Sequence, residues 1–358
     1  MSENSVHNGG LVGFCNPLLD MVARVDAGFL QKYGLKTHDA TLAAVDQMPL
    51  FKELVKTHEA KFLPGGSGQN TLRGAQLLLP ADSTVFIGAV GQDSNADKLR
   101  EAAQKAGLHT DYMVSPDKPT GTCALLITDS GNSMVADLSA AQTYQLTHAQ
   151  RPETWDVVNK ARVLYATGFF LAVSPETVRT VALHALENEH QTFALNVSAP
   201  SIVTSHTAAL LETLPLTDIL FGSSFETEAL CAALGLPVDL HLLVRRLAGW
   251  SKRKSTSRLV VFTTDDGIVV GSGDAETVSV YRFTTTSSSA IVDLNGAGDA
   301  FVAGFLALMM QGRAVDECVE AGIWMRSLVV QQLGASYPDG VLSFEPQGLR
   351  PTAVVQIR

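Results

Sequence analysis

The segment Ile291–Met310 contains a short β-branched run, a glycine-rich turn and the start of an apolar helix. Ile291–Val292 predicts the end of a strand, Asn295–Gly298 carries almost no side chains, and Asp299 opens the helix. The first N–H groups of a helix lack intrahelical partners and carry partial positive charge. Because glycines let this backbone approach closely, the segment predicts a cradle for an anion such as phosphate.

Asp299 lies at the mouth of this predicted cradle. A carboxylate there can accept a proton from an attacking hydroxyl while the amides stabilise a migrating phosphoryl group. We expect Asp299 to be a weak base, because the helix dipole favours its charged form, and phosphoryl transfer tolerates a weak base. Taken alone, the motif equally fits a glycine-rich turn in which Asp299 is an ordinary N-terminal cap.

Length and composition predict one large α/β core with an accessory domain, or two domains. The chain has 358 residues, of which 46% are hydrophobic, so it can fill a large core. No apolar run reaches the about 18 residues of a membrane span, and Met1–Gly10 lacks the pattern of a signal or transit peptide. The net charge of −10 argues against a nucleic-acid partner.

Cysteines and basic residues suggest a reducing compartment and one exposed loop. Four scattered cysteines without a CxxC pair predict free thiols, no zinc site and a cytoplasmic protein. The basic run Lys252–Lys254, with Arg258 close by, predicts an exposed loop, although a position near nucleotide phosphates stays open.

Besides the buried-type strand Thr84–Ala89, five further runs in the first part of the chain predict strands. Asp20 lies inside one of them and is costly there unless it has partners, so it either faces water at a sheet edge or binds sugar hydroxyls. The turn Pro64–Asn70 precedes a helix and lacks the GxxxxGK[ST] pattern, so it is a tight turn or a close backbone approach to a ligand such as ribose. The last four of these runs form a predicted small lid sheet; the five are Leu11–Cys15, Leu18–Ala23, Lys61–Leu63, Thr122–Ile127 and Ser133–Asp137.

From about residue 152, helical and β-rich runs alternate, which predicts a mostly parallel sheet with helices on both faces. The runs Gly267–Val270 and Val278–Tyr281 predict an antiparallel edge. Ligands of such sheets lie at the carboxyl ends of the strands, here the loops 168–170, 196–200, 222–225, 263–267 and 294–298. Phe169 and Phe170 in the first loop either fill the core or stack on a base.

Several separated segments resemble, in order and spacing, the adenosine kinases of the ribokinase-like sugar kinase superfamily. The resemblance extends from Gly13 to Tyr337. It implies a large α/β domain with a central, mostly parallel sheet over residues 1–16, 65–115 and 142–358, and a small β-sheet lid domain over 17–64 and 116–141. The matching segments are CNPLLD (15–20), PGGSGQN (64–70), PTGTCALLI (119–127), ATGFFLAVSPE (166–176), LNVSAP (195–200), DILFG (218–222) and DLNGAGDAF (293–301).

The resemblance also implies a reaction, in which a monomer uses ATP and Mg²⁺ to phosphorylate the ribose 5′-hydroxyl of adenosine to AMP, as in purine salvage. Asp299 would be the general base, and the amides of Gly296, Ala297 and Gly298 the anion hole. The ATP side would use Asn196, Ser224, Thr263, Thr264, Gly296 and Gly298, with Glu228 for the metal. The adenosine side would use Asn16, Leu18, Asp20, Leu42, Gly66, Ser67, Asn70, Cys123, Met134, Ala136, Phe170 and Asn295.

Departures from the family pattern gather on the phosphate-donor side. The segment Gly222–Glu228 lacks the Asn of the usual Asn-x-x-Glu, and Asp265 replaces the Gly of Thr-x-Gly, where it would repel polyphosphate unless it points away. Leu294, Asn132 and Ile323 replace a usual Thr, lid Arg and His. An adenosine-binding pseudoenzyme with weak or no kinase activity, or a kinase for another nucleoside or sugar, therefore stays open. The intact Asn295–Asp299 cradle favours an active kinase.

Overall fold

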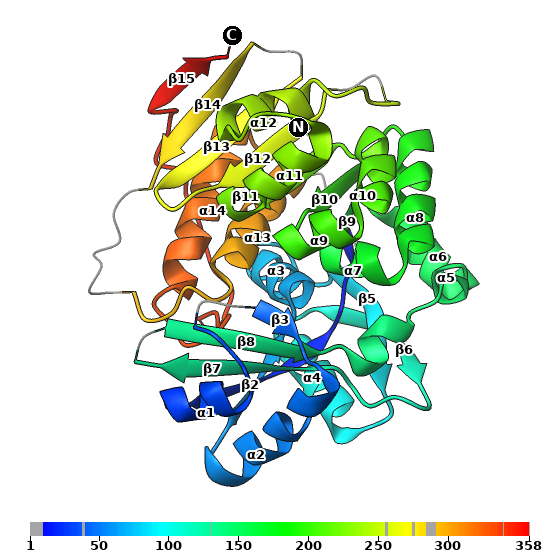
Figure 1. The fold of residues 1–358 in the computed structure, drawn as a ribbon. Helices are drawn as coiled ribbons and strands as arrows, with labels where there is room; N and C mark the ends of the chain where they lie inside the picture. The colour runs from blue at the N-terminus through cyan, green and yellow to red at the C-terminus, as the bar shows by residue number, and fades with distance from the viewer. Residues whose placement is uncertain are drawn as a thin grey trace.

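The computed structural model describes residues 10–37, 40–129, 131–254, 257–273, 276–283, 291–338 and 340–357. Within these ranges the strands form two sheets, one of ten strands and one of five (Figure 1). None of the helices in these ranges has the length and apolar character that a bilayer crossing needs. The four cysteines are free thiols, as predicted. The polar start of the chain, residues 1–9, lies outside the described ranges.

The large sheet has the strand order β15-β14-β13-β12-β11-β10-β9-β1-β5-β6. Seven neighbouring strands are parallel, and many are buried along their whole length, as in β5, which explains their near-continuous apolar sequences. This confirms the predicted, mostly parallel sheet. The parallel strands are β1 (Leu11–Phe14), β5 (Thr84–Gly91), β6 (His109–Ser115), β9 (Val163–Thr167), β10 (Thr192–Asn196), β11 (Ile219–Ser223) and β12 (Leu259–Thr263); the antiparallel edge is β13 (Gly267–Ser272), β14 (Thr277–Arg282) and β15 (Ala353–Gln356).

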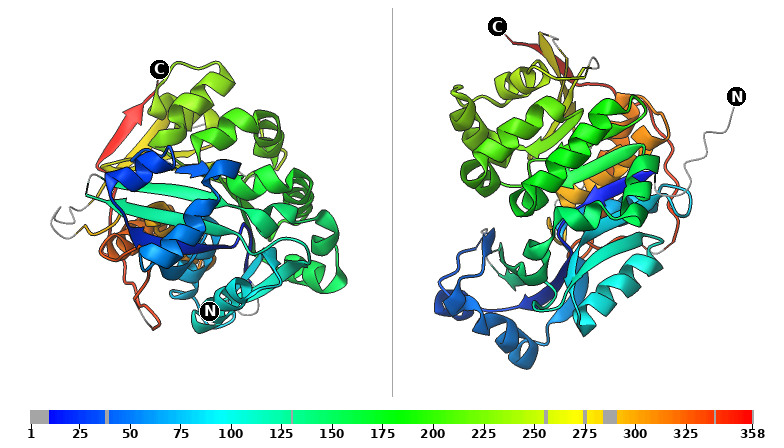
Figure 2. Two further views of the ribbon diagram at one scale, coloured as in Figure 1. Left: turned by 60° about the horizontal axis from the view of Figure 1, so that its bottom comes forward. Right: turned by 90° about the vertical axis from the view of Figure 1, so that its right-hand side faces the viewer.

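Helices cover both faces of the large sheet, and each face has its own apolar core. In β9, Leu164 belongs to one core and Tyr165 to the other, as the alternation of a strand requires. Figure 2 shows the two helical layers on either side of the sheet. One layer is α5 (Leu146–Ala149), α6 (Pro152–Lys160), α7 (Gly168–Val173), α8 (Pro175–Glu187), α9 (Pro200–Ser205), α10 (Thr207–Thr213), α11 (Thr227–Leu234) and α12 (Leu240–Ala248); the other is α3 (Ser67–Gln76), α4 (Ser94–Lys105), α13 (Ala297–Met310) and α14 (Val315–Val329).

The small sheet has the order β3-β8-β7-β2-β4 and is built from two pieces of the sequence, as predicted. Helices α1 (Ala27–Lys32) and α2 (Pro49–Thr57) cover one face through an apolar cluster of their own. The sequence analysis did not predict β3 of this sheet, nor β6 and β15 of the large sheet. The strands of the small sheet are β2 (Leu18–Arg24), β3 (Ala40–Leu42), β4 (Lys61–Gly65), β7 (Thr122–Thr128) and β8 (Gly131–Asp137).

Two local predictions are wrong, both at the carboxyl edge of the large sheet. Ile291–Val292 is not a strand, because the Val292 N–H donates to Val330 O (2.8 Å) at the end of α14 instead of to a sheet neighbour. Phe169 and Phe170 do not form a loop, because α7 begins directly after β9. The Thr167 hydroxyl accepts a hydrogen bond from the Phe170 N–H (3.3 Å) and caps this helix.

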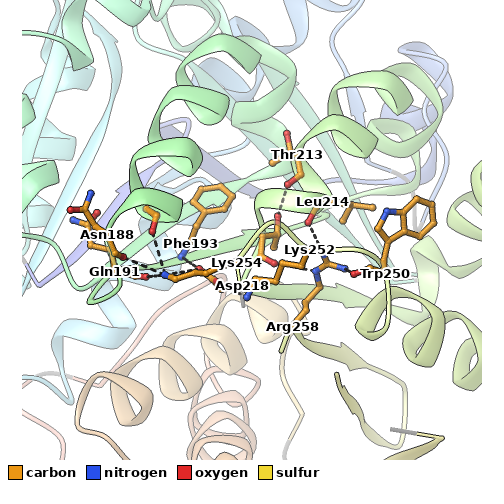
Figure 3. A network of polar contacts seen from close by, with 12 residues as sticks. Asn188, Gln191, Phe193, Thr213, Leu214, Asp218, Trp250, Lys252, Lys254 and Arg258 are labelled. Carbon is orange, nitrogen blue, oxygen red and sulfur yellow. Dashed lines mark hydrogen bonds and ion pairs between the residues drawn. The ribbon is translucent and has the colours of Figure 1, made fainter. Parts of the chain in front are cut away.

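In the basic run 252–254, which was predicted to be an exposed loop, Arg253 is exposed, but the side chains of Lys252 and Lys254 are largely buried and paired (Figure 3). The Lys252 side chain is 6% exposed, and its Nζ lies 2.5 Å from Asp218 Oδ1. Lys254 Nζ donates to the backbone oxygens of Ala185, Asn188 and Gln191. These lysines therefore join the ends of neighbouring elements at the amino side of the sheet.

Arg258 completes this network at the amino end of β12, opposite the edge where ligands of parallel sheets bind (Figure 3). Its guanidinium is almost fully buried and donates to four backbone oxygens, those of Leu214, Thr217, Leu247 and Trp250. Most of these carbonyls follow the ends of helices, where intrahelical donors run out. One side chain thus satisfies several buried acceptors at once.

We predict that Arg258→Met lowers the free energy of unfolding by about 3–5 kcal/mol, because it leaves several buried carbonyls without donors. Urea denaturation followed by circular dichroism measures this change. The matched control is Arg246→Met on the exposed face of α12, which should stay within about 0.5 kcal/mol of the parent. Equal midpoints for the two variants would contradict the structural role of Arg258.

Candidate active site

The order of the parallel strands points to one place for a ligand. Strand β1 has β5 and β6 on one side and β9 to β12 on the other, so the direction of winding reverses between β1 and β9. Ligands of open α/β sheets bind at such a switch point, outside the carboxyl ends of the strands. Asn16 lies there, and its Nδ2 donates to Phe169 O (3.1 Å) across the switch point.

The Asp299 carboxylate joins two helix N-termini at this edge. Asp299 lies in the first turn of α13, and Ser67 is the first residue of α3. Ser67 Oγ donates to Asp299 Oδ1 (2.6 Å), and Asn70 Nδ2 donates to Oδ2 (3.0 Å). The two glycine-rich segments, which are 232 residues apart in sequence, therefore meet at one carboxylate.

Burial raises the pKa of Asp299, and the hydrogen bonds from Ser67 and Asn70 oppose this shift. The direction is the reverse of our expectation from the helix dipole. Loss of solvation acts on the whole carboxylate charge, whereas the dipole supplies only partial charges at one end of a helix. Asp299 is therefore a stronger base than the sequence suggested.

The glycine-rich turn before Asp299 has the backbone shape of an anion site. Gly296 has φ +76° and caps α13, and an added Cβ would lie 2.4 Å from the Cβ of Ala335, so only glycine fits. Around Gly298 an added Cβ would meet open space, so a ligand can approach this backbone. The Ala297 N–H, one of the three predicted anion-hole amides, donates to Leu294 O (3.2 Å) in this structure. The predicted roles of Gly296 and Gly298 in the anion hole, and of Asn295 on the adenosine side, stay predictions.

Asp293 is a site residue that the sequence analysis missed. It is buried, and its Oδ1 accepts from the Asn295 N–H (3.0 Å) and from Asn132 Nδ2 (2.9 Å), while Oδ2 accepts from the Gly334 N–H (3.0 Å). This carboxylate therefore fastens the glycine-rich turn to β8 of the small sheet and to the segment after α14. The sequence signal for Asp293 was an acidic residue two positions before Asn295. Asn132, which stands where the family usually has a lid Arg, donates the hydrogen bond that joins Asp293 to β8.

Four predicted adenosine-side residues form one row across the small sheet. Paired positions run from Leu42 in β3 to Ala136 in β8, Cys123 in β7 and Asp20 in β2. Met134 lies two residues before Ala136 and shares its face. The alternate residues, which include Met21, Ala124 and Val135, pack against α1 and α2 on the other face. The row thus lies on the face that these helices leave uncovered.

Asp20 is buried in this row and lies against the backbone of the turn Pro64–Asn70. An added Cβ at Gly65 would lie 2.1 Å from the Asp20 Cγ, and Gly66 has φ +88°. Burial and the charge of Asp299 raise the pKa of Asp20 to about 7, while Arg73 opposes the shift. The two carboxylates therefore lie close together, and the charge of Asp299 disfavours a second charge on Asp20.

Phe170 does not line the site. Its ring is fully buried, with centroids 6.0 Å from Phe14 and 5.0 Å from Tyr144, so it fills the core. The neighbouring Phe169 is 39% exposed and presents the accessible ring at this edge. Leu18 is buried at the start of β2, where an added Cβ at Gly121 would lie 2.6 Å from its Cδ2.

The predicted ATP-side residues follow three adjacent strands. Asn196 ends β10, Ser224 follows β11, and Thr263 ends β12 in register with Ser223. Asn196 Oδ1 accepts from the N–H of Ser198, which has φ +78°. Thr264 Oγ1, by contrast, donates to Asp266 inside the β12–β13 turn, so its hydroxyl is already engaged.

The buried carboxylate at the end of β11 is Glu226 and not Glu228. Glu226 Oε2 accepts from the Ser223 N–H and Oγ (2.6 Å each), whereas Glu228 is exposed in α11. Burial raises the pKa of Glu226, and the bonds from Ser223 lower it. Ser223 and Glu226 therefore form a capping box at the start of the turn Ser224–Glu226.

Arg326 supplies a positive charge that acts on Asp265, the acidic residue that was expected to repel polyphosphate. Arg326 of α14 lies over the ring of Phe283, with 4.2 Å from its Cζ to the ring centroid. Burial lowers the pKa of Arg326, and the charge of the exposed Asp265 opposes that shift. The charge of Asp265 is thus partly offset by a residue that the sequence analysis did not single out.

Comparisons with known proteins agree on one family. Residues 28–340 match the pfkB family carbohydrate kinase profile. Adenosine kinase 2 of Arabidopsis thaliana is 34% identical over 342 residues, which cover 95% of this chain and 99% of that protein. The structure of Anopheles gambiae adenosine kinase in complex with P1,P4-di(adenosine-5) tetraphosphate is 35% identical with a TM-score of 0.89, covering 94% and 100% of the two chains. That of Schistosoma mansoni adenosine kinase with adenosine and AMP is 28% identical with a TM-score of 0.86, covering 92% and 98%.

The raised pKa of Asp20 predicts a pH-dependent stability. Its charged form is disfavoured in the folded chain, so its destabilising effect is absent below the unfolded pKa near 4 and complete above about 7. Relative to the parent, Asp20→Asn should therefore gain about 2–4 kcal/mol in the free energy of unfolding between pH 4 and pH 8. Urea titrations at both pH values measure this. Asp129→Asn, at an exposed carboxylate of the same sheet region, should show no such trend.

Proposed function

The chain belongs to the pfkB family of carbohydrate kinases and, within it, to the adenosine kinases, and we propose that it transfers the terminal phosphoryl group of ATP to the 5′-hydroxyl of adenosine. The observation that carries this proposal is the Asp299 carboxylate, held by Ser67 and Asn70 directly after the turn Asn295–Gly298. A positioned base beside a helix N-terminus suits a hydroxyl acceptor and a phosphoryl donor.

The small sheet supplies the adenosine side in this proposal. Leu42, Ala136, Cys123 and Met134 offer an apolar face to the purine, and Asp20 accepts hydrogen bonds from the ribose 2′- and 3′-hydroxyls. Among the described residues, the buried Oδ1 atoms of Asn16 and Asn70 have no hydrogen-bond partner. Because unpaired buried acceptors are costly, sugar hydroxyls would satisfy these two atoms.

Asp299 acts on the 5′-hydroxyl. As the 5′-oxygen forms its bond to the γ-phosphorus, the bond from that phosphorus to the β,γ-bridging oxygen breaks, and Asp299 accepts the hydroxyl proton. The N-terminal amides of α13 stabilise the charge on the migrating group. The link from Asn132 to Asp293 holds the small sheet against this turn, which keeps water from the donor.

The donor side receives ATP along the carboxyl ends of β10, β11 and β12, near Asn196, Ser224 and Thr263. Mg²⁺ would neutralise charge on the phosphates. In the described part of the chain no three His, Cys, Asp or Glu side chains gather as a metal site. Mg²⁺ held mainly by substrate phosphates and water needs few protein ligands, and Glu226 is the buried carboxylate at the end of β11 that could take part.

We predict that the protein forms AMP and ADP in equal amounts from adenosine and Mg-ATP, and that Asp299→Asn lowers kcat by about 10²–10⁴-fold. Coupled ADP detection with chromatography of AMP measures both products. Asp97→Asn, an exposed carboxylate in the first turn of α4, is the matched control and should keep the parent rate. Adenosine binding without any AMP would support the pseudoenzyme instead, and full activity of Asp299→Asn would refute the base assignment.

A second prediction concerns the ribose hydroxyls. Asp20→Ala should weaken adenosine binding by about 100-fold, since two hydrogen bonds to a charged acceptor are lost, while 2′,3′-dideoxyadenosine should bind parent and variant alike. In the parent, adenosine affinity should rise as the pH increases through about 7, because Asp20 then becomes charged. Isothermal titration calorimetry measures each affinity. An unchanged affinity in Asp20→Ala would remove Asp20 from the ribose site.

A further inference from the structure

We infer that Tyr337 is a positioning residue that holds Asn70, and through Asn70 the Asp299 carboxylate, in place for phosphoryl transfer. This inference rests on the proposed function and extends it to the segment after α14. Tyr337 Oη donates to Asn70 O (2.9 Å), and the same residue donates from Nδ2 to Asp299 Oδ2 (3.0 Å). Two hydrogen bonds thus connect the C-terminal segment to the base.

The position of Tyr337 is set by close packing between two helices. An added Cβ at Gly74 would lie 2.5 Å from Tyr337 Oη and 2.8 Å from the Cβ of Ala303, so the hydroxyl reaches the contact between α3 and α13. Asn70 and Gly74 are one helical turn apart and lie on the same face of α3. The ring also packs on the cluster of Ala300, Met325 and Val329. Tyr337 therefore fixes the two helices whose first turns carry Asn70 and Asp299.

The surroundings keep Tyr337 a neutral donor. Burial and the charge of Asp299 raise the pKa of its hydroxyl, so the proton stays on Oη at every working pH. Arg73 lies over the ring, 5.8 Å from Cζ to the centroid, and donates to Pro64 O (3.1 Å). The same segment of α3 thus contacts Tyr337 on one side and the end of β4 on the other.

A phenylalanine at this position would keep the ring and lose only the hydroxyl. We predict that Tyr337→Phe lowers kcat about 5–20-fold, with KM for adenosine and for ATP within about twofold of the parent, because the loss affects base placement more than binding. A misplaced Asn70 donates less well to Asp299, whose pKa then rises further. The acid limb of the kcat profile should therefore move to higher pH, as the base must be deprotonated to act.

A comparison of the pH profiles of the parent and Tyr337→Phe reports on Asp299 only if the other titratable groups around Asp299 are unchanged. The titratable residues that sense the charge of this carboxylate from the surrounding elements are Cys15, Asp20, Tyr165 and Tyr337, with Ser67 and Asn70 as its donors. Arg73 lies next in this network, because its charge acts on Asp20 and Tyr337. The variant alters only Tyr337 among them. A shift of the acid limb in Tyr337→Phe then reports on Asp299 or on its coupled neighbour Asp20, and adenosine KM separates the two.

Two further variants separate positioning from simple loss of packing. Tyr281→Phe removes another buried hydroxyl, which donates to Asp316 Oδ1 (2.6 Å) away from the site, and should keep the parent kcat and pH profile. Gly74→Ala suits a helix but places a methyl group against Tyr337 Oη, and should reproduce the kinetic defect of Tyr337→Phe. Thermal unfolding of each protein confirms that it is folded.

The experiment measures kcat, both KM values and the pH profile of the full chain and the three variants. Tyr337→Phe with the parent kcat and acid limb would overturn the role of Tyr337 while leaving the kinase proposal intact. Equal changes in Tyr337→Phe and Tyr281→Phe, or a joint collapse of kcat, KM and stability, would show a merely structural role and also overturn it. A parent protein that forms no AMP would overturn both proposals together.

Discussion

Burial of two carboxylates at one junction is the constraint on which the rest of the site depends. Asp20 belongs to the small sheet and Asp299 to helix α13, which packs on the large sheet, and burial raises the pKa of both. Charged groups are kept from water only where neighbours supply donors or opposite charge. The N-terminal turn of α3 provides donors for Asp299, and Arg73 provides the nearby positive charge for Asp20. Both glycine-rich segments are therefore needed to bring these groups together.

The two ends of the parallel strands in the large sheet carry different kinds of polar groups. At the amino ends of β11 and β12, Lys252 pairs with Asp218, and Arg258 donates to four backbone carbonyls. At the carboxyl ends, Ser198 and Gly296 adopt φ above +70°, and acceptors of Asn16 and Asn70 stay unpaired among the residues described. Strained and unsatisfied groups mark sites that are completed by a ligand. The amino ends thus carry paired charges, whereas the carboxyl ends carry the groups of the proposed site.

Local patterns predicted the elements of this fold well, and long-range partners poorly. The parallel sheet, the small sheet and both glycine-rich turns follow from periodicity and turn residues, which act over a few positions. The burial of the Lys252 and Lys254 side chains, the core position of Phe170 and the bond from Asn132 to Asp293 depend on segments far apart in the chain. A sequence pattern does not contain these partners. The row from Leu42 to Asp20 likewise needed β3, which is too short to show a period.

The pKa of Asp299 depends on the relative size of two opposing effects, the dipole of α13 and burial. A helix N-terminus favours a charged carboxylate by a fraction of a unit charge, so the sequence suggested a weak base. Removal from water acts on the full charge and outweighs the dipole, and Ser67 and Asn70 return only part of the lost solvation. A carboxylate whose pKa lies above its usual range accepts a proton more readily, which brings it closer to the optimum for general base catalysis at neutral pH. The burial that makes Asp299 costly in the folded chain is thus the property that suits it to its proposed reaction.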